Sequence, residues 1–313
     1  MTQYVLRRLL LLPVVLFGVS VLVFMVLHLV PGNPAQVIAG PDAPPETVAA
    51  IEHELGLDRP LPEQYALYIG RVLQGDLGRS LRSRRPVLDD VLDALPNTLE
   101  LAVAAAVITP LLALPLGVAA AARRGTNLDS ALMLISMLGI TVPVFALALG
   151  FMWVFGYQLR LFPISGYGGP IWTPEGLRSV FLPALTLAVG AVAALARLTR
   201  SAMLEVLNQD FVRTARAKGL REQVVLLRHG LANAMLPIVT VAGLQVALLL
   251  SGAFVTETVF AWPGVGRLAV FAIQARDFPL VQGTVLVIAV MFVLVNLAID
   301  VLYAYLDPRI HYT

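Results

Sequence analysis

The largest group of basic side chains in this 313-residue chain lies between residues 197 and 231. It holds the only lysine, Lys218, and six arginines: Arg197, Arg200, Arg213, Arg216, Arg221 and Arg228. The part from Asp210 to Pro237 is basic, has a helical period and is interrupted by Gly219. Such an ordered basic segment suggests a surface that a partner protein grips, and not an active site.

Other groups that could do chemistry are sparse. The chain has no cysteine, which excludes disulfides, zinc-thiolate sites and thiol catalysis. Lys218 follows Ala217, so it cannot be the lysine of a GxxxxGK[ST] phosphate loop, and the sequence contains no such loop. The four histidines, at positions 28, 53, 229 and 311, are scattered and form no His-Glu-x-x-His pattern. We therefore expect no catalytic residue, no bound metal and no bound cofactor in this chain.

The composition indicates a membrane protein. Hydrophobic residues make up 58% of the chain and charged residues 13%, whereas soluble domains carry about 25% charged residues. The mean hydropathy is +0.82. The net charge of +2 is too small to indicate nucleic-acid binding. We expect an all-α protein with several membrane spans.

Six apolar runs are long enough for spanning helices, which need about 20 residues: 9–29, 99–122, 131–156, 179–197, 232–256 and 279–303. The first run is too long for a cleaved signal peptide and ends in Val-Pro-Gly-Asn-Pro. Arginines 7 and 8 precede it, and the predicted inner loops 123–130 and 197–231 are rich in arginine. The positive-inside rule then predicts that both termini lie in the cytoplasm.

A polar segment, residues 31–98, separates the first two runs and holds ten acidic residues against six arginines. Its pattern predicts helices at 46–55, ended by Gly56, and at 61–73, followed by a turn at 74–78. A third short helix would start after Pro86 and end at Pro96. We expect a small external cap, which is either a solvated loop or a docking surface for an external partner.

The basic segment itself predicts two helices. The fourth span would continue to Leu207, and Asp210 would cap a helix over 211–218 with Arg213, Arg216 and Ala217 on one face. Gly219 suits a left-handed turn after that helix. A second helix, 221–234, would bury the stripe formed by Val224, Leu227 and Leu231. A cytoplasmic loop whose positive charges only set the membrane orientation would explain the arginines but not the predicted helices.

The outer loop 257–278 is too apolar for an ordinary loop and too short to span. Residues 262–266 read as a tight turn, and residues 268–275 as a helix that re-enters the membrane or lies on its surface. The segment is either an interfacial anchor led by a tryptophan or a gate over a pore. The candidate outer-gate residues are Glu257, Trp262, Pro263, Gly264, Gly266 and Arg267.

Several motifs of the chain resemble those of a known family. Arg-Thr-Ala-Arg-Ala-Lys-Gly (213–219), Leu-Leu-Arg-His (226–229) and Ala-Met-Leu-Pro (234–237) look like the cytoplasmic coupling segment of binding-protein-dependent ABC importer permeases. The resemblance is to the first permease subunit of the dipeptide/oligopeptide branch and runs nearly end to end. It includes the motifs at 30–34, 55–58, 64–65, 75–78, 96–102, 143–145, 257–267 and 306–309.

The segment departs from the general importer pattern Glu-Ala-Ala-x-x-x-Gly-x9-Ile-x-Leu-Pro. Aligned on Gly219, Arg213 stands in place of the glutamate, and Leu236-Pro237 falls five residues late. The glutamate's role therefore cannot be transferred to this chain, while the resemblance to the peptide branch is unaffected.

The resemblance implies the type I importer permease fold: an N-terminal span (1–30), an extracytoplasmic helical insert (31–95), a five-helix transmembrane domain (96–306, coupling segment 208–234) and a cytoplasmic tail (307–313). It implies a second permease, two ATPase subunits that hold ATP and Mg, and an external solute-binding protein. The implied ATPase-coupling residues are Arg213, Thr214, Ala215, Arg216, Ala217, Lys218, Gly219, Leu220 and Arg221.

The implied function is one half of a translocation pathway for short peptides, driven by rigid-body alternating access. A permease for nickel chelates or for glutathione, within the same family, is the nearest alternative. A secondary transporter working alone is a more distant one, because it needs coupling charges that the predicted spans almost lack.

Overall fold

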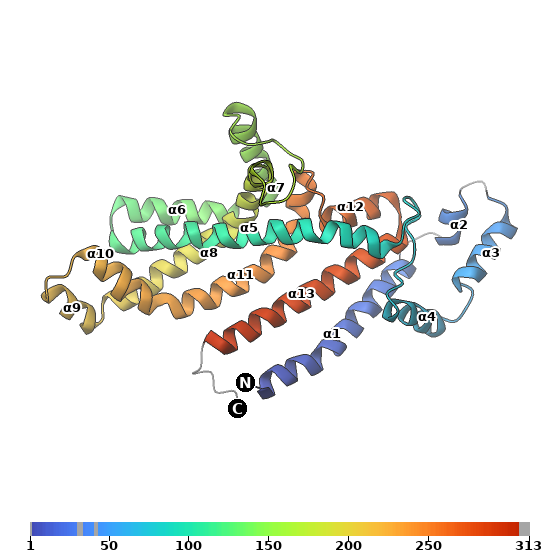
Figure 1. Cartoon of the computed structure of the whole chain (residues 1–313), viewed down its shortest axis with the longest axis horizontal. Helices are drawn as coiled ribbons and strands as arrows, with labels where there is room; N and C mark the ends of the chain where they lie inside the picture. Colours follow the sequence, from blue (N-terminus) through green and yellow to red (C-terminus); the bar gives the residue numbers. More distant parts are fainter. Residues whose placement is uncertain (1, 30–33, 41–42, 307–313) are drawn as a thin grey trace. The chain divides into compact units, whose positions relative to one another are not determined.

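The structure is a computed structural model that describes residues 2–29, 34–40 and 43–306. Within these ranges the chain forms helices and no strand, which confirms the all-α prediction (Figure 1). The elements are α1 (Thr2–Leu29), α2 (Pro34–Ala39), α3 (Pro45–Leu55), α4 (Leu61–Leu73), α5 (Val87–Ala122), α6 (Asn127–Thr141), α7 (Val144–Phe151), the π-helix η1 (Met152–Gln158), α8 (Pro174–Leu207), α9 (Asp210–Ala217), α10 (Glu222–Val224), the π-helix η2 (Val225–Leu231), α11 (Ala232–Val259), α12 (Val265–Ala275) and α13 (Phe278–Leu306).

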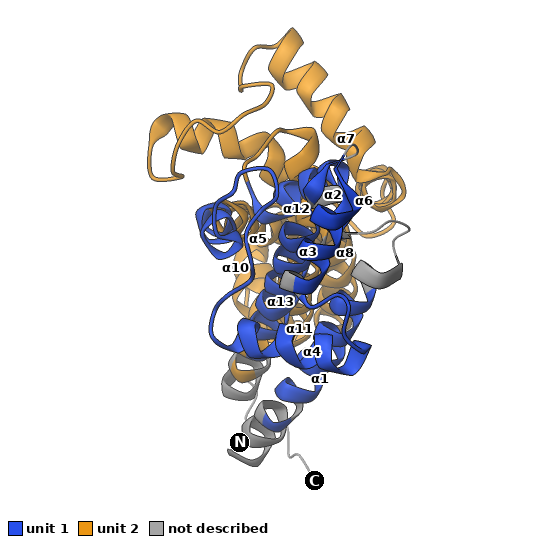
Figure 2. Ribbon diagram, turned by 90° about the vertical axis from the view of Figure 1, so that its right-hand side faces the viewer, with its two compact units in different colours: residues 1–96, 264–297, 312 blue, residues 97–263, 298–311, 313 orange. Residues whose placement is uncertain are grey.

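The helices fall into two compact units (Figure 2). Unit 1 consists of residues 1–96 and 264–297 and includes α1 to α4, the start of α5, α12 and most of α13. Unit 2 consists mainly of residues 97–263. These units group residues by packing and not by membrane side, so the predicted division at residues 30, 95 and 306 stays a prediction.

The helix α5 is longer than predicted. Pro96 does not end a short helix, because α5 continues through it from Val87 to Ala122. A proline inside a helix costs about 3 kcal/mol. One buried stripe passes through this position at alternating spacings of four and three residues, which favours an unbroken helix: Val87, Val91, Ala94, Thr98, Leu101 and Ala105.

The third predicted span, 131–156, is not one straight helix. The chain bends by 110° between α6 and α7. Val142 is extended, with ψ at 127°, and Pro143 precedes the first residue of α7. A proline disfavours helical backbone in the residue before it and supplies no N–H, so α6 ends here. The proline, which an apolar count ignores, therefore divides this span in two.

Four of the described helices are long and apolar enough to cross a membrane, or five if the bent α6–α7 pair is one span. The four are α5, α8, α13 and the helix that starts at Glu222 and runs into α11. The first predicted span lies in α1, whose apolar part among the searched residues, Leu12–Met25, is shorter. These helices confirm a polytopic membrane protein, whereas the count of six spans stays a prediction.

Two helices of the polar segment agree with the sequence. The helix α3 ends before Gly56, which has the left-handed φ of 70°, and α4 has the predicted bounds. The helix α4 contacts α1 through a ring cluster that includes Phe24 and Tyr65, whose ring centres lie 5.4 Å apart. The Tyr65 hydroxyl also lies 2.7 Å from Ser20 Oγ. These contacts fix α4 along the first helix.

Unit 2 is organised around α8, which packs against α6, α7 and α11. Leu182 and Leu195 of α8 are fully buried. At one end of this bundle α9 and α10 project beyond α8, as Figure 1 shows at its left. The core of unit 2 thus holds the elements on which the predicted coupling residues lie.

Candidate functional site

The helix α9 begins one residue before its predicted start. Gln209 occupies the N-cap position without a side-chain hydrogen bond, and Asp210 is the first residue of the helix. The prediction that Asp210 is the N-cap is therefore wrong. Its carboxylate instead accepts from Arg213 Nη1 at 3.3 Å, one turn further along the helix. A carboxylate in the first turn still stabilises the helix through the macrodipole.

One face of α9 is buried and the other is exposed. Val212 and Ala215 join the core cluster of unit 2 together with Met203, Val206 and Val225. The predicted coupling residues other than Ala215 are exposed: Arg213, Thr214, Arg216, Ala217, Lys218, Gly219, Leu220 and Arg221. The helix is therefore held on the end of the bundle by apolar contacts and presents its basic face outward.

The turn after α9 is built as expected. Gly219 has a φ of 76°, in the left-handed region that residues with a Cβ rarely adopt. The Arg216 guanidinium closes the turn by donating to the Glu222 carboxylate at 2.8 and 3.2 Å. This hydrogen bond raises the pKa of Arg216, while burial acts in the opposite direction. The arginine thus keeps its charge at the edge of the exposed face.

The helix after the turn differs from its prediction. Val224 and Leu227 are 37% and 57% exposed, while Val225 and Gly230 are buried. The predicted stripe is therefore wrong for two of its three residues, although Leu231 does pack against the core. Residues 225–231 form a π-helix, in which hydrogen bonds span five residues and not four. Counting at the α-helical period therefore selects the wrong face.

Gly230 marks where this π-helix meets α8. A Cβ at this position would lie 2.9 Å from the Met203 Cε atom and 3.3 Å from Leu207 Cδ2. The close approach packs η2 on α8, and the shared core cluster adds α9, so that the three elements form one packed projection.

Three of the candidate gate residues lie in unit 2 and are held by α5. Trp262 is fully buried, and its Nε1 donates to the Asn97 carbonyl at 2.8 Å. Asn97 Nδ2 donates to the Pro263 carbonyl at 2.9 Å. Glu257 is also fully buried and accepts from Thr98 Oγ1 at 2.7 Å. The tryptophan is thus fixed inside the protein and does not form an anchor exposed at a membrane surface.

The other three candidates, Gly264, Gly266 and Arg267, lie in unit 1 around the start of α12. Gly264 and Gly266 are buried, and Arg267 is exposed. The expected helix at 268–275 is present as α12. A gate role stays a prediction for both groups of residues.

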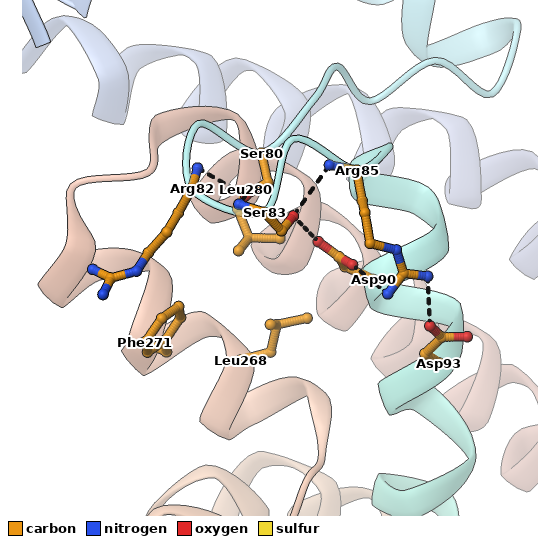
Figure 3. Close-up of a pocket in the computed structure, with 9 residues that line it drawn as sticks. All are labelled: Ser80, Arg82, Ser83, Arg85, Asp90, Asp93, Leu268, Phe271 and Leu280. Atoms are coloured by element: carbon orange, nitrogen blue, oxygen red, sulfur yellow. Dashed lines mark hydrogen bonds and ion pairs between the residues drawn. The ribbon is translucent and has the colours of Figure 1, made fainter. Parts of the chain in front are cut away.

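Unit 1 contains a groove of about 300 Å³ that sequence reasoning did not single out (Figure 3). Its floor is apolar, from Leu268, Phe271 and Leu280, and Phe271 is 46% exposed. The Arg82 guanidinium lies 5.4 Å from the Phe271 ring centre, in cation–π range. Arg82 forms no ion pair with the residues that the structure describes. The groove therefore combines an apolar floor with an available positive charge.

The rim of the groove is held by ion pairs and hydrogen bonds. Arg85 is bound by Asp90 at 3.0 Å and by Asp93 at 2.8 Å, and the Asp93 hydrogen bond is the main cause that raises the pKa of Arg85. Ser80 Oγ donates at 2.6 Å to the buried carboxylate of Asp277. These contacts fix the arginine-rich loop 79–85 against the start of α13.

A partly buried ion pair in unit 2 was also missed. Arg200 of α8 donates through Nε and Nη2 to the two carboxylate oxygens of Asp129, at 2.6 and 2.7 Å. The Gly125 amide donates to the same carboxylate at 3.0 Å. Asp129 is the only acidic residue between Glu100 and Glu175. This isolation in the sequence is the signal that could have marked Asp129 as a paired residue.

The described residues contain no group of three or more His, Asp or Glu that could hold a metal ion. His53 instead pairs with Asp58 at 2.8 Å, and this hydrogen bond is the main cause that lowers the pKa of Asp58. The described residues thus form exposed surfaces and packed helices.

Comparison with known proteins decides the family. Residues 113–312 match the family described as "Binding-protein-dependent transport system inner membrane component", and residues 1–102 match "Binding-prot-dependent transport system membrane comp, N-term". The chain belongs to this family of ABC importer permeases. It is a multi-pass inner-membrane protein, and its family consists of non-catalytic transport subunits that work with other ABC subunits.

Relatives of this permease match over 100% of both chains. They include the dipeptide transport system permease protein of Alkalihalophilus pseudofirmus, 40% identical, and the glutathione transport system permease protein of Salmonella choleraesuis, 44% identical. The glutathione permease protein of Escherichia coli O6:H1 is 43% identical. The permease therefore falls in the peptide branch, as its motifs indicated.

Proposed function

We propose that this permease forms half of the pathway by which an ABC importer moves short peptides into the cell. The observation that carries the proposal is the identity of 40–44% over the full length to dipeptide and glutathione permeases. Glutathione is itself a tripeptide, so both names point to a small molecule with amide bonds and free carboxylates. Nickel chelates remain the alternative cargo within the family.

The proposed partners are a second permease, two ATPase subunits and an external solute-binding protein. ATP and Mg would be held by the ATPase subunits, which carry out the hydrolysis. The exposed face of α9 and its turn, from Arg213 to Arg221, supports docking of an ATPase subunit on this side. Both termini would then lie in the cytoplasm, as the distribution of arginines predicts.

The external binding protein would contact the groove of unit 1. An acidic loop with one apolar side chain would complement it, because Arg82 offers a charge beside the apolar floor of Phe271 and Leu268. This assignment gives the polar segment the role of a docking surface.

The test is purification with the co-expressed subunits in mild detergent, followed by reconstitution into liposomes. Co-purification of two ATPase subunits and a second permease is expected. ATP-dependent uptake is then measured for a labelled dipeptide, glutathione and a nickel chelate. Uptake of either peptide supports the proposal, whereas uptake of the nickel chelate alone would replace the substrate. An assembly that transports none of the three contradicts it.

A further inference from the structure

The ion pair between Asp129 and Arg200 joins the first turn of α6 to α8. It is bidentate, and the exposed fraction of the two side chains is only 6% and 25%. The geometry fixes the orientation of both side chains, since the planar guanidinium matches the carboxylate with two parallel hydrogen bonds. The Asp129 carboxylate also accepts a hydrogen bond from the Gly125 amide, so the loop before α6 is part of the same contact.

The α8 partner of this pair lies next to the coupling projection. Arg200 precedes Met203 by three residues on the same helix, and Met203 is fully buried against the π-helix at Gly230. Met203 and Val206 share a core cluster with Val212 and Ala215 of α9. Because close-packed contacts transmit displacement, a movement of α9 must also move Arg200.

The α6 partner lies at the start of a helix that ends in the sharp bend. The helix α6 runs from Asn127 to Thr141, and the 110° bend at Val142–Pro143 follows it. Asp129 has no acidic neighbour in sequence that could replace it, because no other carboxylate occurs between Glu100 and Glu175. Among the residues that the structure describes, this is the only ion pair between α6 and α8.

We propose that Asp129 and Arg200 are positioning residues that carry the displacement of α9 to α6, so that ATPase movement reaches the bent helix pair. The inference rests on the proposed function, because it takes α9 as the ATPase contact. The helices α6, α8 and α9 then move as one rigid body up to the bend at Pro143. Loss of the pair separates ATP hydrolysis from transport without removing the ATPase subunits.

The experiment uses the complete importer in liposomes, with its second permease, ATPase subunits and binding protein. The variants are Asp129→Asn, Arg200→Gln, Arg200→Lys and the exchanged pair Asp129→Arg with Arg200→Asp. The matched control is Arg197→Gln, which removes an exposed charge from the same helix. Dipeptide uptake and ATP hydrolysis are measured together, and their ratio is the readout.

We expect Asp129→Asn and Arg200→Gln to retain the ATPase subunits and ATP hydrolysis, while peptide moved per ATP falls about tenfold, within the usual range of coupling between sites. The ratio of peptide uptake to ATP hydrolysis for Arg200→Lys should lie between the ratio of these variants and that of the unchanged protein, because an ammonium cannot bind both oxygens in parallel. The exchanged pair should recover part of the ratio, and Arg197→Gln should keep it.

An unchanged ratio in both single variants overturns the inference. So does an equal loss of hydrolysis and uptake, which would mean that the pair only stabilises the fold. If the single variants do not accumulate, the exchanged pair decides: a lowered ratio in an assembled complex supports the inference, and failure to assemble overturns it. If the unchanged protein shows no ATP-driven peptide uptake, the proposed function fails instead, before any variant is compared.

Discussion

The Arg216 guanidinium donates to both carboxylate oxygens of Glu222, at 2.8 and 3.2 Å, across the turn at Gly219. The two side chains are 44% and 57% exposed, so the pair contributes at most about 1 kcal/mol. The pair therefore shapes the exposed face more than it stabilises the fold. Charge reversal at Arg216 would alter the turn and the face together, which makes neighbouring residues better probes of docking.

Reversing the charges of Lys218 and Arg221 should weaken ATPase binding. Both residues are exposed, and neither takes part in an ion pair within the described part of the chain. The double variant Lys218→Glu with Arg221→Glu should cost on the order of 2 kcal/mol of docking free energy. Arg197→Glu serves as the control, because this exposed arginine of α8 lies outside the coupling segment, and the variant should retain the ATPase subunits. Equal retention in the variant and the control, measured by co-purification, would contradict the docking assignment.

Replacement of Gly219 should act through the backbone. Valine at a φ of 76° costs about 1–3 kcal/mol of local strain, whereas asparagine tolerates this region. We expect Gly219→Val to lower peptide uptake at an unchanged membrane level of the chain. Gly219→Asn should transport nearly as well as the unchanged protein. Uptake assays with quantified membrane protein decide the question, and a functional valine variant would show that the turn geometry is unimportant.

The groove of unit 1 predicts a contact with the binding protein. Arg82→Glu and Phe271→Ala should each weaken binding to the assembled importer by about 1–2 kcal/mol, because one removes the charge and the other the apolar floor. The control is Arg71→Glu, an exposed arginine of α4 that does not line the groove. Binding is measured by titration of the importer with labelled binding protein. Equal affinity of all three variants would exclude this surface.

The fully buried Trp262 predicts a structural cost. Trp262→Ala removes a ring packed edge-on against Tyr167 and the hydrogen bond to the Asn97 carbonyl. The loss should be about 3–5 kcal/mol and should lower the midpoint of thermal unfolding in detergent. Trp172→Ala is the matched control, since this tryptophan is 78% exposed. Similar midpoints for the two variants would contradict the buried arrangement.

Two tyrosines of α4 should respond oppositely to removal of the hydroxyl group. The Tyr65 hydroxyl bonds to Ser20, so Tyr65→Phe should cost about 1 kcal/mol. The buried Tyr68 hydroxyl finds no hydrogen-bond partner among the described residues, so Tyr68→Phe should be neutral or stabilising. Thermal unfolding of the two variants compares them directly, and a larger loss for Tyr68→Phe would contradict this assignment.

Tyr68 also predicts a pH dependence. Burial raises its pKa from 10.0 to about 12. Because the folded pKa is the higher one, the stability that depends on the neutral hydroxyl is complete below pH 10 and is lost as the pH rises through 12. Tyr68→Phe should remove this part of the stability loss at alkaline pH. The loss can be followed by measuring the midpoint of thermal unfolding across that pH range.

Much of the fold was predictable because helices leave strong local signals. The bounds of α4, the extension of α8 to Leu207 and the turn at Gly219 all follow from apolar period and glycine chemistry. Proline accounts for two opposite errors: its helix-ending effect was assumed at one position and left out of account at the other. Pro96 lies inside α5, where a continuous buried stripe overrides it, whereas Pro143 follows a bend that the apolar count did not show.

The missed parts of the candidate site depend on contacts between distant residues. Asp129 and Arg200 are 71 residues apart, and the groove joins the loop at Ser80 to α12 and α13. Periodicity describes one helix at a time, so it cannot pair such residues. The exposed face of α9 was predictable because it depends on a single short helix with Val212 and Ala215 on its buried side.

The π-helix η2 changes how relatives of this chain should be aligned. Each wide turn takes up a residue that an α-helix would not need, so residue counts across 225–231 overstate the distance along the helix axis. A relative with an α-helix here would require a gap, although its coupling turn and its Leu-Pro pair could occupy equivalent places in space. Evolution can lengthen or shorten this connection by one residue and thereby rotate the exposed basic face relative to the helix that follows.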